Sequence, residues 1–226
     1  MGLQGNTKGD DFLKNRCVIV GGARINNYDF VKNHIKEDDF IIYCDGGLSH
    51  LEGLGGSVDL IIGDFDSHEN PNMDKETIVL PTVKDDTDTV YAVKEAVKRG
   101  FRDFVMVGVI GGRFDHTLGN LSMLLYLDNL GAKGMLVDDY SEITLLSAKD
   151  GAPSECRVKD DCKYFSIICA EKKASGITIR NAKYEVEDFE MTNDTPIGVS
   201  NEVIKNKEAV IEIREGKIFV IKVVSE

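Results

Sequence analysis

Short apolar segments alternate with helical or turn segments over the first 140 residues, and this alternation limits the folds open to the chain. The segments show no two-residue alternation of apolar and polar side chains, so both faces of each strand are expected to be buried. Strands of this kind are typical of a parallel sheet with helices on both sides. The pattern predicts an α/β domain with a mostly parallel, Rossmann-like sheet over residues 16–139, with strands at 17–20, 40–44, 59–62, 77–80, 104–110 and 135–137.

Glycine and acidic residues follow most of these strands. Asp45-Gly46-Gly47 comes directly after one strand and Gly63-Asp64-Phe65-Asp66-Ser67 after the next. Gly111-Gly112-Arg113-Phe114-Asp115-His116 follows the most apolar strand. Ligands of open α/β sheets bind at the carboxyl ends of the strands. The motifs are therefore expected to meet at one rim of the sheet.

Asp64 and Asp66 are two residues apart in a segment that leaves a strand. On extended backbone their side chains point the same way, so the two charges repel unless a cation lies between them. Oxygen ligands suit a hard cation such as Mg²⁺. Acidic residues are also common in ordinary loops after strands, and this motif alone does not decide between a metal site and a loop.

A helix is expected from Thr87 to Gly100, because Val90, Val93 and Val97 recur at helical spacing. Asp86 or Thr87 is the expected cap. Three acids, Asp85, Asp86 and Asp88, crowd its first turn, where acidic side chains stabilise a helix. Their number exceeds what capping needs, and Lys84 adds a cation suited to phosphate. Two more helices are expected at 28–35 and 118–130, and one or two helical turns at 48–54.

The pattern changes after residue 140. Short strands are expected at 143–146, 164–170, 177–179, 209–214 and 217–223, and no helix. Glu215-Gly216 has the form of a hairpin turn between the last two strands. These features predict a second, all-β domain over residues 140–226, built as a sandwich. Residues 1–15 are polar, lack the apolar core of a secretory signal and are expected to form a flexible tail.

Charge and cysteine usage exclude several classes of function. The net charge of −12 argues against nucleic acid or an anionic membrane as a partner. No segment reaches the roughly 20 apolar residues of a membrane span. The five cysteines include no Cys-x-x-Cys pair, which fits neither a disulfide framework nor a zinc site. A cytoplasmic protein is expected.

Five motifs together resemble the thiamine pyrophosphokinase family, over nearly the whole chain from residue 16. They are Asp45-Gly46-Gly47, Gly63-Asp64-Phe65-Asp66-Ser67, Lys84-Asp85-x-Thr87-Asp88, Gly111-Gly112-Arg113-Phe114-Asp115-His116 and Gly198-Val199-Ser200-Asn201-Glu202. Each motif is weak by itself, and their order and spacing make the resemblance specific. It implies transfer of pyrophosphate from ATP to the hydroxyl of thiamine, with AMP as the other product. It also implies a homodimer with thiamine in a cleft between the subunits.

The resemblance assigns expected roles to the matching positions. Mg²⁺ on the ATP triphosphate would be held by Asp64, Asp66 and Asp88. Nucleotide or phosphate contacts would come from Asp45, Gly46, Gly47, Ser67, Lys84, Asp85, Thr87 and Arg113. Catalysis would fall to Asp64, Asp66, Asp88 and Asp115, with either Asp66 or Asp88 as the proton acceptor if the metal leaves it available. The thiamine end would be bound by Asp115, His116, Ser200 and Asn201.

The chain departs from animal members of the family in having no tryptophan, so the stacking partner of the thiamine rings is left unassigned. A supporting role as a hydrogen-bond donor is favoured for His116 over direct participation. Two other functions stay open at this point. One is a haloacid-dehalogenase-type phosphatase with Asp64 as nucleophile, since an apolar strand precedes Asp-x-Asp. The other is a non-catalytic thiamine or nucleotide sensor.

Overall fold

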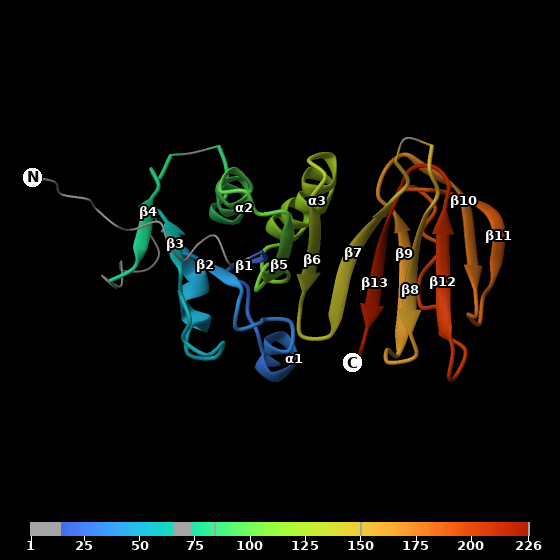
Figure 1. Ribbon diagram of the computed structural model, residues 1–226, viewed down its shortest axis with the longest axis horizontal. Coiled ribbons are helices and arrows are strands. Elements are labelled where there is room, and N and C mark those ends of the chain that lie inside the picture. Colours follow the sequence, from blue (N-terminus) through green and yellow to red (C-terminus); the bar gives the residue numbers. More distant parts are fainter. Residues whose placement is uncertain (1–14, 66–73, 84, 150, 226) are drawn as a thin grey trace, which may run out of the picture.

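A nine-stranded sheet runs along the molecule and a four-stranded sheet packs against one end of it (Figure 1). The computed structural model describes residues 15–65, 74–83, 85–149 and 151–225. The larger sheet has the strand order β4-β3-β2-β1-β5-β6-β7-β13-β9 and the smaller one β11-β10-β12-β8. The predicted fold class, a mostly parallel α/β sheet joined to a β sandwich, is confirmed.

The first six strands of the larger sheet are parallel, and their bounds are β1 Cys17–Val20, β2 Phe40–Cys44, β3 Leu60–Gly63, β4 Glu76–Val79, β5 Asp103–Val107 and β6 Lys133–Val137. The chain passes from β1 to β4 in one direction and from β5 to β6 in the other. The connection reverses between β1 and β5, which are adjacent. Such a switch point leaves a crevice at the carboxyl ends of the two strands.

Helices cover both faces of the parallel strands (Figure 1). Alternate residues of β1 face opposite sides, with Ile19 in the core on one face and Val18 in the core on the other. Both are fully buried, which explains why these strands lack a polar alternation. The helical segments are α1 Tyr28–Lys32, η2 Asp45–His50, α2 Asp88–Lys98 and α3 Phe114–Asn129.

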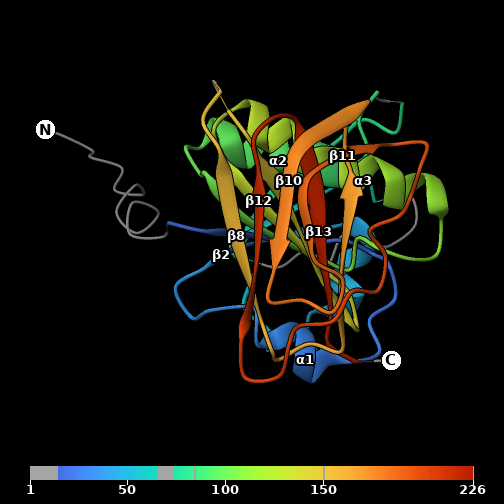
Figure 2. The ribbon, with the colours of Figure 1, turned by 90° about the vertical axis from the view of Figure 1, so that its right-hand side faces the viewer.

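The sandwich forms where the larger sheet continues into antiparallel strands. The bounds are β7 Ser141–Ser147, β8 Ser154–Lys159, β9 Tyr164–Cys169, β10 Lys173–Arg180, β11 Val186–Thr192, β12 Glu208–Ile213 and β13 Lys217–Val223. In Figure 2 the smaller sheet faces the viewer and covers β13. Phe165, Ile177, Ile211 and Ile218 are fully buried between the two sheets. β7 pairs with β6, so one sheet spans the predicted division at residue 140.

Several predicted elements differ in detail. Strand β5 ends at Val107 rather than residue 110, because Gly108 adopts φ +62° and leaves the strand direction. The helix predicted at 118–130 begins earlier, at Phe114. Strands β8 and β11 were not predicted, since exposed polar residues interrupt their apolar pattern.

The predicted hairpin at Glu215-Gly216 is wrong. Strand β12 pairs with β10 and β8, whereas β13 pairs with β7 and β9. The two residues therefore carry the chain from one sheet of the sandwich to the other. A turn motif reports a local reversal of the backbone, and it does not determine which strand becomes the hydrogen-bond partner.

Candidate active site

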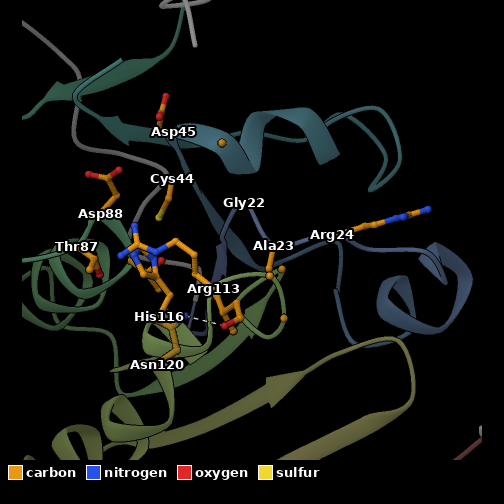
Figure 3. Close-up of a pocket in the computed structure, with 16 residues that line it drawn as sticks. Gly22, Ala23, Arg24, Cys44, Asp45, Thr87, Asp88, Arg113, His116 and Asn120 are labelled. Atoms are coloured by element: carbon orange, nitrogen blue, oxygen red, sulfur yellow. Dashed lines mark hydrogen bonds between the residues drawn. The ribbon is translucent and has the colours of Figure 1, made fainter. Parts of the chain in front are cut away.

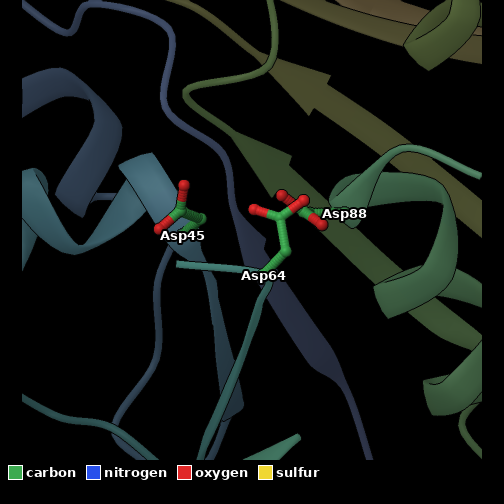
Figure 4. A group of neighbouring side chains, drawn as sticks. All are labelled: Asp45, Asp64 and Asp88. Carbon is green, nitrogen blue, oxygen red and sulfur yellow. The ribbon is translucent and has the colours of Figure 1, made fainter. Parts of the chain in front are cut away.

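Three carboxylates converge at the carboxyl ends of the parallel strands. Asp45 begins η2 directly after β2, Asp64 follows β3, and Asp88 is the first residue of α2 (Figure 4). Each offers one oxygen, and these oxygens all lie within 4.8 Å of one another. Two oxygens on opposite sides of a Mg²⁺ ion are about 4.1 Å apart. Small side-chain rotations would therefore let the three carboxylates share one ion.

The predicted metal set was Asp64, Asp66 and Asp88. Asp64 and Asp88 lie together in the cluster, and their companion among the described residues is Asp45, for which only a nucleotide contact was predicted. Asp66 lies outside the described residues, as do Ser67 and Lys84. Sequence spacing alone could not show that Asp45 joins the cluster, because β2 and β3 become neighbours only through sheet pairing.

Glycines allow the elements that carry the cluster to pack closely. A Cβ atom on Gly63 would lie 2.9 Å from Cβ of Asp45, closer than real Cβ contacts allow. A Cβ on Gly22 would lie 3.1 Å from backbone atoms of Gly46. Gly46 and Gly47, predicted to contact the nucleotide, lie in η2, where Gly47 packs against the backbone of Val20. The glycine motifs therefore set the distance between strand ends.

Replacing Gly63 by Ala is expected to lower kcat/KM about tenfold or more, because the new methyl group displaces Asp45 from the cluster. A displacement of a catalytic group by about 1 Å can lower the rate by up to about a hundredfold. The matched control is Gly119→Ala, since a Cβ at this α3 position meets no atom within 4 Å. The control should retain activity and gain about 0.5–1 kcal/mol of stability. Steady-state kinetics and urea unfolding of both variants check this, and equal activity of the two would contradict it.

A hollow of about 320 Å³ lies beside the carboxylates. Figure 3 shows Asp45 and Asp88 on one side of it and Arg113 and His116 toward another. Asn120, buried beneath, donates a 2.7 Å hydrogen bond to the carbonyl of Val109 and so fixes the loop after β5 to α3. The hollow is lined by Gly22, Ala23, Arg24, Cys44, Asp45, Gly46, Thr87, Asp88, Thr89, Gly108, Val109, Gly111, Gly112, Arg113, His116 and Asn120.

Thr87 fulfils its predicted role as helix cap, because its side chain accepts a 3.3 Å hydrogen bond from the amide of Val90. This leaves Asp88 in the first turn of α2, with its carboxylate in the cluster. Asp86 instead pairs with Lys94 at 2.7 Å. Asp85 is exposed and is not among the residues that line the hollow. Only one of the three acids in this motif therefore reaches the cluster.

Arg113 and Asp115 form an ion pair at the rim. Nη2 of Arg113 lies 2.6 Å from Oδ2 of Asp115, and both side chains are more than 60 % exposed (70 % and 65 %). The guanidinium lowers the pKa of Asp115. Arg113 and His116 line the hollow, whereas Asp115 does not. The catalytic and thiamine-binding roles given to Asp115 remain predictions.

Two buried side chains hold the loop between β1 and α1 beside the hollow. Nε2 of His50 donates to the carbonyl of Ala23 at 2.9 Å, so its Nδ1 accepts from the hydroxyl of Tyr28 at 2.7 Å. Burial lowers the pKa of His50 and favours this neutral form. Asp139 accepts 2.8 Å hydrogen bonds from the amides of Asn26 and Asn27. Neither anchor could be predicted from sequence, since each acts on a segment distant in the chain.

Replacing Asp139 by Asn is expected to lower the free energy of unfolding by about 1.5–3 kcal/mol at pH 7. Oδ2 of Asp139 also accepts a 2.6 Å hydrogen bond from Nδ2 of Asn26, and a neutral amide cannot replace the charged acceptor there. Burial of Asp139 would raise its pKa, but these hydrogen bonds lower it overall. A lowered folded-state pKa stabilises the protein above the unfolded value of about 3.9. The difference between variant and wild type should therefore shrink as pH falls through the lowered pKa. Urea unfolding from pH 7 to pH 3 measures it, and a constant difference would contradict it.

Ser200 and Asn201 lie in the sandwich, far from the carboxylates. The backbone of Asn201 pairs with Phe165 on β9, at the edge of the larger sheet opposite β4. The Asn201 side chain is buried and bonds the backbone of Tyr184 in both directions, at 3.0 and 2.8 Å. It also lines an apolar hollow of about 180 Å³ with Tyr184, Phe189, Ile197 and Val199. Ser200 is exposed and has φ +60°.

Two family models match the chain, one in each of its two sheet regions. The model of the thiamin pyrophosphokinase catalytic domain matches residues 31–136, and that of the thiamin pyrophosphokinase vitamin B1 binding domain matches residues 155–218. The chain belongs to the thiamin pyrophosphokinase family. The two matched segments correspond to the parallel sheet with its carboxylates and to the sandwich that carries Asn201. The family resemblance inferred from the five motifs is confirmed.

Individual relatives cover most of the chain. The thiamine pyrophosphokinase of Bacillus subtilis is 26 % identical over 203 residues, 86 % of this chain and 92 % of the relative. Thiamin pyrophosphokinase 1 of Caenorhabditis elegans is 23 % identical, over 86 % of this chain and 84 % of the relative. The crystal structure of the Bacillus subtilis thiamine pyrophosphokinase shares the fold with a TM-score of 0.80 at 22 % identity, over 93 % of this chain and 100 % of that one. These matches favour neither the phosphatase nor the sensor.

Proposed function

We propose that this family member transfers the pyrophosphoryl group of ATP to the hydroxyl of thiamine, giving thiamine diphosphate and AMP. The convergence of Asp45, Asp64 and Asp88 at the switch point carries the proposal. Three anions within 4.8 Å repel one another, and a bound cation offsets that repulsion. A chain with net charge −12 needs local positive charge to attract a triphosphate, and a bound cation would supply it.

The cluster fits Mg²⁺, because all three ligands are carboxylate oxygens from separate, well-packed elements. Asp45, Asp64 and Asp88 would hold the ion, and Asp66 remains a predicted further ligand. Bound there, Mg²⁺ would neutralise charge on the phosphate oxygens and on the departing AMP. Carboxylates that hold a metal have lowered pKa values and are poor bases. Asp66 or Asp88 could therefore accept the proton only if its carboxylate is not fully bound to the metal ion.

The protein's own groups would place the reacting atoms. Thiamine's hydroxyl oxygen would form a bond to the β-phosphorus, and the bond from that phosphorus to the oxygen bridging to the α-phosphate would break. Gly22 and Gly46, which have no side chains, leave backbone open to phosphate at the edge of the hollow. Arg113 would exchange its exposed partner Asp115 for a phosphate oxygen, and Lys84 is a predicted second cation.

Thiamine is proposed to bind at the sandwich segment that contains Ser200 and Asn201. Asn201 would act mainly by shaping this segment, because its amide group already bonds the backbone of Tyr184. The adjacent apolar hollow offers the rings of Tyr184 and Phe189. Either ring could pack against thiamine in a chain that has no tryptophan. This supplies candidates for the stacking partner that the sequence left unassigned.

A homodimer is proposed because the two halves of the site are far apart within one chain. Strands β1, β5, β6, β7 and β13 lie between β2, which leads to Asp45, and β9, which pairs with Asn201. Six strand spacings of about 4.8 Å amount to roughly 29 Å, farther than a thiamine molecule reaches. A second copy that places its sandwich beside the carboxylates would complete the site.

The direct test is to incubate the protein with ATP, Mg²⁺ and thiamine and to identify the products by mass. AMP and thiamine diphosphate should appear in equal amounts, only when thiamine is present and only without excess EDTA. Thiamine monophosphate with ADP would overturn the assignment of the attacked phosphorus. Labelled phosphate trapped on Asp64 would support the phosphatase, and tight binding without products would support the sensor.

A cytoplasmic location is proposed on cysteine chemistry. All five cysteines lie in the described part of the chain and are free thiols, and Cys17 and Cys44 are buried in the core. Free thiols persist in reducing compartments. Within residues 15–65, 74–83, 85–149 and 151–225, no helix has the length and apolar character that crossing a membrane requires.

A further inference from the structure

A buried histidine links the segment that carries Asp45 to the loop that follows β1. His50 is the last residue of η2, the short helical segment that begins at Asp45. Its Nε2 donates to the carbonyl of Ala23 at 2.9 Å, and its Nδ1 accepts from the hydroxyl of Tyr28 at 2.7 Å. The imidazole therefore ties the far end of η2 to the loop after β1 and to the start of α1.

The loop that receives the hydrogen bond from His50 is itself fixed to the sheet. The amide of Gly21 donates to the carbonyl of Val107 at 2.8 Å, and the amide of Ala23 donates to the carbonyl of Gly108 at 2.8 Å. These two bonds hold the loop against the end of β5. Because the loop is bonded to the sheet through its amides, its Ala23 carbonyl offers His50 a fixed point of attachment.

Close backbone contacts limit the movement of η2 in one direction only. A Cβ on Gly47 would overlap the carbonyl oxygen of Val20, and a Cβ on Gly22 would lie 3.1 Å from backbone atoms of Gly46. Figure 3 shows Gly22 and Ala23 beside the helical segment that starts at Asp45. Such contacts prevent η2 from moving toward the loop, but they do not prevent it from moving away. The hydrogen bond from His50 to Ala23 opposes movement away.

This restraint matters because Asp45 is held against electrostatic repulsion. Its carboxylate has an oxygen within 4.8 Å of oxygens of Asp64 and Asp88, so without a cation the three charges push η2 away from its neighbours. The segment has six residues, and helical segments this short are not stable through their own hydrogen bonds. An attachment outside η2 is therefore needed to keep the Asp45 carboxylate in place.

We propose that His50 is a positioning residue for the metal site, which acts by bonding Ala23 and so holding η2, with the Asp45 carboxylate, beside Asp64 and Asp88. His50 is not among the residues that line the hollow, and in this role it touches neither metal nor substrate. The inference rests on the proposed function, since it concerns the carboxylates that would hold Mg²⁺. It assigns to His50 an effect on metal binding that is separate from its contribution to stability.

Two substitutions of similar size test the hydrogen bond to Ala23. Gln can place an N–H near the position of Nε2, so His50→Gln should keep this bond, whereas His50→Met fills the same space without a donor. The Mg²⁺ concentration for half-maximal turnover should rise about tenfold in His50→Met, as is typical when a group that supports metal ligands is lost. It should stay close to the wild-type value in His50→Gln.

Thermal melts and hydrogen exchange give readouts that do not need turnover. Mg²⁺ near the wild-type Kd should stabilise wild type and His50→Gln, because an ion that binds only the folded state raises its stability. His50→Met should lose most of this gain, and its amides at 46–50 should exchange faster in metal-free buffer. The matched control is His34→Gln, since Nδ1 of His34 lies 3.0 Å from the carbonyl of Phe30, within α1. The control should change stability without changing the response to Mg²⁺.

The comparison also decides against the inference if it fails. A response to Mg²⁺ in His50→Met equal to that of the wild type would overturn it, as would an equal loss in His50→Gln and His50→Met. Should His50→Met fold poorly, His50→Asn makes the same comparison, because Asn offers Tyr28 an acceptor but does not reach Ala23. A wild type that is stabilised by Mg²⁺ but makes no thiamine diphosphate would refute the proposed function, and the melts would still decide this inference.

Discussion

The Asp45→Asn variant should lose about 10²–10⁴-fold in kcat, because it removes one of three carboxylates that would hold the metal on the triphosphate. It should fold normally in metal-free buffer. Asp45 is buried (7 % exposed) near two other anions, so loss of its charge relieves repulsion. We expect its metal-free melting temperature to equal or exceed that of the wild type.

Thermal melts with and without Mg²⁺ separate a metal ligand from a merely structural residue. The wild type should be stabilised by Mg²⁺, because an ion that binds only the folded state raises its stability. Asp45→Asn should lose most of this gain, and so should Asp64→Asn and Asp88→Asn. The matched control is Asp86→Asn, which breaks only a surface pair with Lys94 and should change stability by less than about 1 kcal/mol. Near-normal turnover of all three cluster variants at saturating Mg²⁺ would refute the metal site.

Mixing two inactive variants should restore activity if the site is shared between subunits. One partner is Asp45→Asn, defective at the carboxylates. The other is Ser200→Arg, which places a cation where the positively charged thiamine would bind and changes an exposed residue. In a heterodimer one site combines both defects and the other is intact. Random exchange of equal amounts should restore about a quarter of wild-type activity, since half the dimers are mixed and each has one good site.

The mixing experiment has a built-in control. Refolding or exchanging each variant with itself should restore nothing, because every site then retains its defect. Glycine readily adopts the φ of +60° found at this position, so Ser200→Gly should keep the backbone conformation and remain active. If the mixture is only as active as the two variants measured separately, the whole site lies in one chain. That result would contradict the roughly 29 Å separation estimated from the strand order.

The candidate site was partly predictable from sequence. Asp64 and Asp88 could be predicted because both lie in acidic motifs, Asp64 directly after a strand and Asp88 at the start of a helix. Both belong to the cluster. Asp45 was placed at the same rim without being recognised as a cluster member.

Most of the helices and strands, and the family, could be inferred from the amino-acid order alone. Apolar strands without alternation required a sheet covered on both faces, and Gly63 marked the end of one strand. Which strand ends meet became clear only from the folded chain. Asp45 and Asp88 are brought together by parallel pairing of β2 and by packing of α2 on the sheet, and β12 and β13 are separated into different sheets. Side-chain periodicity encodes which face of an element is buried, whereas the identity of the neighbouring element depends on the packing of the whole chain.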